Sequence, residues 1–216
     1  MGKQTAKKDL KRFYDHLYKA FGAQAWWPAK TRFEVVVGAI LTQNTNWTNV
    51  EKAIKNLKAE GALTIKAMHA LSEDRLATLI RPSGYFNVKA RRLKAFLSWL
   101  HESYSGSLDR LFKVAELREE LLSVNGIGPE TADSIILYGA KRPVFVIDAY
   151  TKRILTRHGL ASDDASYAEM QKLFMDNMAH DEKVFNEYHA LIVRVSKEYC
   201  KSKNPLCSEC PLGDYL

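Results

Sequence analysis

The chain has 216 residues, 46% of them hydrophobic and 26% charged, so it can bury one large or two small cores and is not disordered throughout. Its formal net charge of +7 and isoelectric point near 9.2 favour an anionic partner, although a merely soluble basic protein also fits. No run approaches the roughly 18 apolar residues of a membrane span, and the lysine-rich start lacks an apolar signal core. We therefore expect a cytoplasmic protein, nucleoid-associated in a prokaryote, without membrane contact.

Apolar residues recur at helical spacing along most of the chain, and little of it alternates with period two, so an all-α fold is predicted. The first amphipathic stripe runs from Phe13 to Phe21, an apolar helix opens near Val36, and a further helix lies around Leu76. Ser72, followed by two acidic residues, has the pattern of a helix N-cap. Short connectors between these stretches indicate a compact helical bundle.

A glycine hairpin lies between two later helical runs. Its turn consists of Asn125, Gly126, Ile127 and Gly128, and paired glycines allow a turn whose backbone amides face outward. Such amides can hold a phosphate. Pro129 suits the first turn of the second helix, where its missing N–H costs nothing. The alternative is an ordinary helix connection in which the glycines serve only as a C-cap.

The hairpin and four further segments resemble the endonuclease III superfamily of DNA glycosylases, which has a helix-hairpin-helix followed by a Gly/Pro-rich loop and an aspartate. The further segments are LTQNT from Leu41, SGYFNVKARRL from Ser83, VIDAYTKRIL from Val146, and YHALIV with the terminal cysteines, in the family's order. The resemblance covers nearly the whole chain. It implies a middle six-helix bundle, which ends in the hairpin, and a second helical domain built from both termini. The predicted boundaries are an N-terminal helix in 1–29, the bundle in 30–139 and the C-terminal part in 140–216.

By this resemblance, Asp148 is the catalytic aspartate of an enzyme that releases a base flipped out of damaged double-stranded DNA. Loss of the base leaves an oxocarbenium-like C1′, which a nearby carboxylate can stabilise while it orients water. Asp148 also precedes the helical run AYTKRIL, so it can cap that helix as well. A monomeric enzyme is expected.

Glu130 is the most discriminating departure from the family pattern. Members that also cut the DNA strand have a lysine at the matching hairpin position, and its amine attacks C1′ to form a Schiff base. A glutamate cannot do this, so the sequence predicts a monofunctional glycosylase without AP-lyase activity. Glu130 also suits the first turn of a helix as an acidic residue.

Substrate choice depends on the base pocket, for which Trp26, Trp27, Trp47 and Glu130 are the candidates. The tryptophans fall where a branch similar to 3-methyladenine DNA glycosylase III has the aromatic residues that sandwich the damaged base. Alkylation makes a purine cationic, and aromatic faces attract cations by roughly 0.5 to 2 kcal/mol. The alternative for Trp26 and Trp27 is core packing. Alkylated purines, and 3-methyladenine in particular, are therefore the predicted substrates.

Two other functions stay open for this sequence. One is a glycosylase that acts on oxidised or deaminated pyrimidines or on mismatched thymine, because relatives without the lysine include such activities. The other is a non-catalytic DNA-binding module that keeps the hairpin as a grip. The presence of Asp148 makes this module the weakest of the three.

Several polar residues are candidates for DNA contacts. Gln43 matches the family residue that fills the gap left by the extruded nucleotide, although a polar contact at a helix end would also explain it. His189 follows the family's tail pattern and is assigned no chemistry. Phosphate contacts are predicted for basic residues beside the motifs, or else these are solvated helix charges. The candidates are Lys89, Arg91, Arg92, Lys152 and Arg153.

Cys200, Cys207 and Cys210 are spaced C-x6-C-x2-C, and such clustering in a cytosolic chain suggests metal binding and not disulfides. The spacing is that of the family's [4Fe-4S] loop, whose fourth cysteine follows after five intervening residues, where this chain has Leu216. Three options follow: a cluster with a different fourth ligand, a loop without a cluster, or a chain shortened before a ligand. A [4Fe-4S] cluster with a structural and DNA-docking role is favoured.

Overall fold

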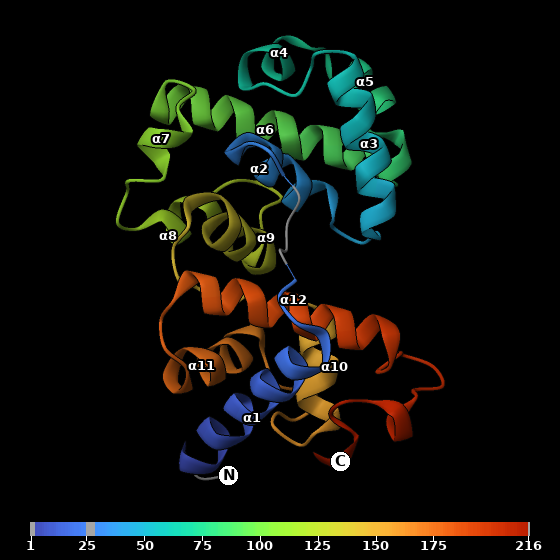
Figure 1. The fold of residues 1–216 in the computed structure, drawn as a ribbon. Helices are drawn as coiled ribbons and strands as arrows, with labels where there is room; N and C mark the ends of the chain where they lie inside the picture. Colours follow the sequence, from blue (N-terminus) through green and yellow to red (C-terminus); the bar gives the residue numbers. More distant parts are fainter. Residues whose placement is uncertain (1–2, 25–28, 216) are drawn as a thin grey trace. The chain divides into compact units, whose positions relative to one another are not determined.

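The structure is a computed structural model that describes residues 3–24 and 29–215, which form helices and no strand (Figure 1). The all-α prediction is confirmed. The chain divides into two compact units, one made of residues 1–26 and 141–216 and the other of residues 27–140. Among the helices of the described residues, none combines the length and apolar character that a membrane span needs.

The first unit combines the two ends of the chain. Its elements are α1 (Lys3–Phe21), α10 (Ala149–Arg157), α11 (Tyr167–Asn177), α12 (Glu182–Glu198) and the 3-10 turns η3 (Cys207–Glu209) and η4 (Gly213–Tyr215). Helix α12 packs against α1 and α10, and α1 also packs against α11. The core between them is aromatic: the rings of Phe145 and Phe174 stack at 3.6 Å, and Tyr188 donates to the Leu10 carbonyl at 2.8 Å. These contacts join sequence-distant segments into one core.

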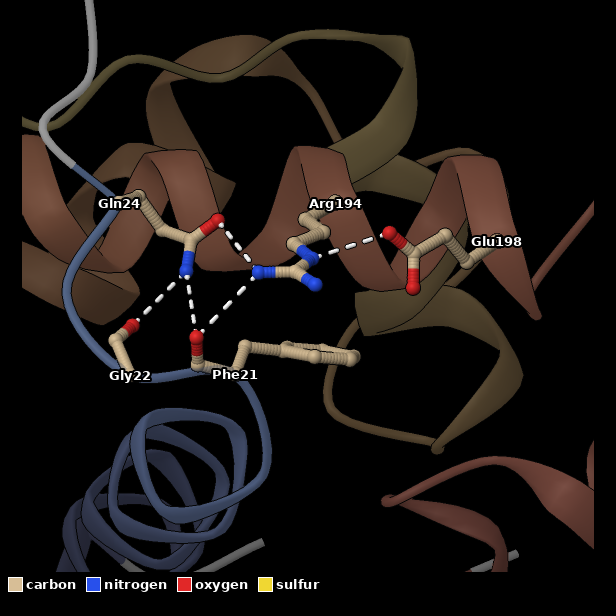
Figure 2. Close-up of polar contacts among 5 residues, drawn as sticks. All are labelled: Phe21, Gly22, Gln24, Arg194 and Glu198. Atoms are coloured by element: carbon tan, nitrogen blue, oxygen red, sulfur yellow. Dashed lines mark hydrogen bonds and ion pairs between the residues drawn. The ribbon is translucent and has the colours of Figure 1, made fainter.

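Arg194 on α12 fastens the chain where it leaves α1 (Figure 2). Its Nη1 donates to the Phe21 carbonyl and to the Gln24 side chain, both at 3.3 Å, and its guanidinium lies 4.5 Å from the Phe21 ring. Glu187, two turns earlier on α12, accepts the Gln24 backbone N–H at 2.8 Å. The segment that follows α1 is thereby fixed on the C-terminal part of the chain.

The second unit is built around α2, in which every residue from Phe33 to Leu41 is buried. Its elements are α2 (Arg32–Leu41), α3 (Trp47–Ala59), α4 (Ile65–Ala70), α5 (Glu73–Leu79), η1 (Arg81–Ser83), α6 (Phe86–Tyr104), α7 (Leu108–Leu111), α8 (Leu117–Leu122), α9 (Pro129–Ser134) and the π-helical turn η2 (Ile135–Ala140). Helix α2 packs against α3, α6, α9 and η2. The continuous apolar run of α2 is therefore explained by neighbours on several of its faces.

Local signals predicted the helix ends of this unit well. Ser72 caps α5 through a bond from the Arg75 N–H, and Pro129 is the first residue of α9, as expected. The stretch around Leu76 divides into the two short helices α4 and α5, because Leu71 adopts an extended conformation after α4.

Candidate functional site

The predicted hairpin is present as α8, a six-residue turn and α9. Gly126 has φ +88°, a conformation that favours glycine, and a Cβ at Gly128 would meet open space. The N–H groups of Gly126 and Gly128 donate to nothing within the described part of the chain, whereas the Ile127 N–H bonds to the Val124 carbonyl at 3.0 Å. Of the predicted phosphate contacts, the two glycines fit best. Asn125 is exposed beside them.

Ile127 has a different place from the one predicted. Its side chain is buried and its N–H is already used inside the turn, so it anchors the hairpin to the core and does not offer an amide to a phosphate. Val124, near the start of the same turn, is buried as well. Two apolar side chains thus hold the turn in place.

Lys89 is also corrected by the structure. Its side chain is 1% exposed, and its ammonium donates to the Leu41 carbonyl at 2.8 Å and the Ser83 carbonyl at 2.6 Å. Burial, and in second place the charge of Arg92, lower the pKa of Lys89 to about 8. A side chain buried in this way does not reach a phosphate. Lys89 instead satisfies carbonyls at the end of α2 and in η1.

Gln43 lies in the turn after α2, half-buried against the hairpin. Its amide nitrogen donates to the Gly126 carbonyl at 3.0 Å and to the Thr131 hydroxyl at 2.9 Å. The structure therefore brings together two motifs that the sequence predicted separately, the QNT segment and the glycine turn.

Asp148 lies in the other unit, at the N-cap of α10. Its Oδ1 accepts the Thr151 N–H at 2.7 Å, which confirms the expected cap. Its Oδ2 lies 3.5 Å from Nε2 of His189, which is long for a hydrogen bond but close enough for strong electrostatic interaction. His189 is 5% exposed, and no chemistry was predicted for it from the sequence. Lys152, on the next turn of α10, is half-exposed.

The carboxyl of Asp148 is held in its ionised form. Burial alone raises its pKa, but the His189 ring and the Thr151 N–H outweigh burial and hold the pKa below the ordinary value of 3.8. An acid with a depressed pKa stabilises the folded protein above its unfolded pKa, and this stabilisation is lost as the pH falls through the folded pKa.

A pH-dependent stability test follows for His189. We expect His189→Ala to lower the free energy of unfolding at pH 6 by on the order of 1 kcal/mol more than at pH 3, because the stabilisation from the depressed pKa of Asp148 is full above the ordinary carboxyl pKa of 3.8 and decreases below it. Urea denaturation at both pH values measures this. The control is Ile192→Val, a change at another buried residue of α12, which should lower the free energy of unfolding equally at both pH values. Equal losses for His189→Ala at pH 6 and pH 3 would contradict the coupling.

Trp47 opens α3 and lines a cavity of about 350 Å³. Its indole N–H donates to Glu51 at 2.9 Å, and Glu34, which also lines the cavity, pairs with Lys58 at 2.6 Å. The volume is within the range of about 300–1,000 Å³ that is typical of small-molecule sites. Two carboxylates and the lysines Lys55 and Lys58 line it, so its charges balance and the aromatic ring is its distinguishing group. The sequence had not singled out Glu34 or Glu51.

Trp26 and Trp27, the other two predicted pocket tryptophans, lie outside the described residues. Glu130 is exposed in the first turn of α9, so its role as a first-turn acid is confirmed. Glu130 and Trp47 belong to one unit and Asp148 to the other.

Cys200 lies just after α12, Cys207 opens η3 and Cys210 follows η3, and all three line one small cavity. Nη1 of Arg157 donates to Sγ of Cys200 at 3.2 Å, and a Cβ at Gly213 would lie 2.3 Å from the Cys207 carbonyl oxygen. The loop therefore requires glycine at this position to close around the thiols. Within residues 3–24 and 29–215, no three His, Cys, Asp or Glu side chains are arranged to hold a single metal ion. The three thiols that line this cavity are of the ligand type that an iron-sulfur cluster requires.

Comparison with known families decides the classification. The model of the HhH-GPD superfamily of base excision DNA repair proteins matches residues 37–180. The chain belongs to this superfamily. The iron-sulfur binding domain of endonuclease III matches residues 200–215, which contain the three cysteines. The two matches together explain the hairpin, the aspartate and the cysteine loop.

Similarity to individual proteins supports the same superfamily. The chain is 46% identical over 217 residues to a protein of Methanocaldococcus jannaschii whose name assigns it provisionally to the DNA repair glycosylases, with 99% of this chain and 98% of the relative covered. It is 30% identical to endonuclease III of Thermotoga maritima, with 85% and 81% covered. The solved structure of the H. pylori 3-methyladenine DNA glycosylase bound to 1,N6-ethenoadenine is 29% identical, covers 89% of this chain and 97% of its own, and has a TM-score of 0.76.

An iron-sulfur cluster can be tested directly on the glycosylase. Protein purified without oxygen is expected to be yellow-brown and to contain iron and sulfide, because Cys200, Cys207 and Cys210 supply three thiolates. Cys207→Ala should lose the colour and the iron, while Ser208→Ala, a change between the ligands, should keep both. Leu216→Cys should increase the iron content by restoring the fourth family ligand. Wild-type protein that stays colourless after anaerobic reconstitution with ferrous iron and sulfide would show a loop without a cluster.

Proposed function

We propose that this protein is a monofunctional DNA glycosylase that hydrolyses the N-glycosidic bond of alkylated purines. Asp148 is the catalytic carboxylate in this proposal. Its depressed pKa keeps it ionised near neutral pH, and an anion is what an oxocarbenium-like C1′ requires. His189 and the Thr151 N–H hold both oxygens in place, so the carboxylate needs little reorganisation during the reaction.

The observation that carries the choice of alkylated purines is the cavity beside Trp47. The Trp47 indole is oriented by Glu51, so its face is fixed before a base arrives. An aromatic face attracts a cationic methylated purine more strongly than a neutral base. The charge on such a base also weakens the glycosidic bond, so the enzyme needs little general-acid help. Similarity to the H. pylori 3-methyladenine DNA glycosylase supports the same substrate class.

Base release from methylated DNA tests the proposal. Duplex DNA treated with a methylating agent is incubated with the protein, and the released bases are separated by chromatography. We expect 3-methyladenine among the released bases and abasic sites in intact strands. Absence of any methylated base from the soluble fraction, with enzyme that still binds DNA, would reject this substrate class.

Trp47 gives a sharper test of the pocket. Trp47→Ala should lower kcat/KM for methylated purines by roughly 5- to 150-fold, the cost of a lost base–aromatic stack. Trp47→Phe retains an aromatic face and should lose much less. Activity on 1,N6-ethenoadenine, a neutral base, should fall less than activity on a cationic base in the Ala variant. Equal losses on both bases would show that charge recognition does not involve Trp47.

A second candidate substrate class is oxidised or deaminated pyrimidines, which the similarity to endonuclease III favours. Oligonucleotides that each carry one defined lesion separate the two classes. Faster release of such a pyrimidine than of 3-methyladenine would favour the second class. For either substrate class, Glu130 favours base release without strand cleavage, because the matching hairpin position has no amine.

We also propose that the cysteine loop holds a [4Fe-4S] cluster through Cys200, Cys207 and Cys210. When bound, the cluster would supply a rigid crosslink and no redox step of the reaction. Arg157 and Arg153 fix the loop, since they donate to the Lys201 carbonyl at 2.7 Å and the Cys200 carbonyl at 2.6 Å. The basic loop itself contributes to the attraction of DNA phosphates.

A further inference from the structure

Arg92 on α6 lies where the QNT turn meets the hairpin. Its Nη1 donates to the side-chain oxygen Oε1 of Gln43, while the side-chain nitrogen Nε2 of Gln43 donates to the Gly126 carbonyl and the Thr131 hydroxyl. Both ends of the Gln43 amide are therefore engaged. Only one orientation of the amide is compatible with these partners, because the reverse would place its NH₂ group against a guanidinium.

The stem of Arg92 also covers the hairpin turn. A Cβ at Gly126 would lie 2.3 Å from Cγ and 2.7 Å from Cδ of Arg92, so glycine is required at Gly126 for space as well as for its φ of +88°. Arg92 thus contacts the turn with its aliphatic part and Gln43 with its charged end. Its neighbour Arg91 differs: that side chain is 66% exposed and its nearest acidic partner, Glu73, is 3.9 Å away.

Helix α6 fixes the QNT turn at a second point. Lys89, three residues before Arg92 and hence on the same helix face, donates to the carbonyl of Leu41, the last residue of α2. The turn that holds Gln43 follows directly. The two basic side chains of α6 therefore determine where Gln43 lies relative to the hairpin.

We infer that Arg92 is a positioning residue that joins Gln43 to the glycine turn, so that both meet DNA as one surface. This inference rests on the proposed function, in which the hairpin and Gln43 contact DNA. Arg92 acts through Gln43 and Gly126, because its Nη1 donates to the Gln43 side-chain oxygen and its aliphatic stem covers Gly126.

The test is a double-mutant cycle on binding to a duplex with a tetrahydrofuran abasic-site analogue. Arg92→Met keeps an aliphatic stem on Gly126 and removes the guanidinium. We expect it to weaken binding about tenfold in the wild-type background, the equivalent of one charge-assisted hydrogen bond, and less than about twofold in the Gln43→Ala background. The salt slope of binding should stay at the wild-type value.

Arg91→Met is the matched control, since it removes the same charge one residue away. Its effect on binding should be the same in the wild-type and Gln43→Ala backgrounds. An Arg92→Met variant whose salt slope falls by about 0.9, with a loss that adds to that of Gln43→Ala, would overturn the inference and make Arg92 a phosphate contact. An Arg92→Met variant with wild-type affinity would also overturn it.

The same double-mutant cycle, measured as the free energy of unfolding, tests the contact between Arg92 and Gln43 without DNA. Coupling between Arg92→Met and Gln43→Ala is expected there, and strict additivity would overturn the inference. Wild-type protein that bound neither the abasic nor the undamaged duplex would instead reject the proposed function. The two failures are therefore distinguishable.

Discussion

Asp148→Asn is expected to lower the rate of base release from methylated DNA by roughly 100- to 1,000-fold, with DNA binding retained. The variant removes one negative charge and almost no volume. If the carboxylate stabilises positive charge at C1′, its effect is on the transition state, so kcat falls while the affinity for an abasic duplex stays the same. Single-turnover base release and duplex binding measure the two quantities.

The structure provides a control that separates catalysis from capping. Asparagine is as good an N-cap as aspartate, so Asp148→Asn should keep the bond from the Thr151 N–H and the stability of α10. Asp148→Ala should lose the cap as well, at a cost of about 1 kcal/mol in the free energy of unfolding. We expect both variants to be equally inactive, and the alanine variant to be less stable than the asparagine variant by the cost of the lost cap. An Asp148→Asn variant with near wild-type base release would leave Asp148 as a cap alone.

Glu130→Lys is expected to create AP-lyase activity that the wild-type protein lacks. The lysine amine would attack C1′ of the abasic sugar and lose water to form an imine, which borohydride reduces to a stable protein–DNA bond. Glu130 is exposed in the first turn of α9, so the longer side chain meets no packing barrier. Denaturing gels of borohydride-treated reactions report the covalent complex.

Glu130→Gln is the control for this experiment, because it removes the acid without adding an amine. Neither wild type nor Glu130→Gln should form a trapped complex. A wild-type protein that gave the trapped complex would contradict the monofunctional assignment, as another amine would then be acting. Trapping by the lysine variant only in the presence of Asp148 would further show that base release precedes the lyase step.

Local sequence determined the helices and their ends. The cap at Ser72, the first-turn proline Pro129 and the cap at Asp148 each depend on groups within about four residues, so their patterns could be interpreted without a fold. The motif order likewise indicated the family, and with it a two-unit helical fold that no single motif specifies. Catalytic and DNA-contacting candidates followed from that resemblance.

Tertiary structure decided what these residues touch. The sequence predicts Lys89 as a phosphate contact, yet its ammonium is buried and donates hydrogen bonds to the carbonyls of Leu41 and Ser83. His189 meets Asp148, and Arg92 meets Gln43, only because helices distant in sequence pack together. Periodicity shows which face of a helix is buried but not which neighbour it meets. The sequence by itself therefore determined the family and the local caps. Packing decided which charged side chains are buried, which are exposed and which bind a distant residue.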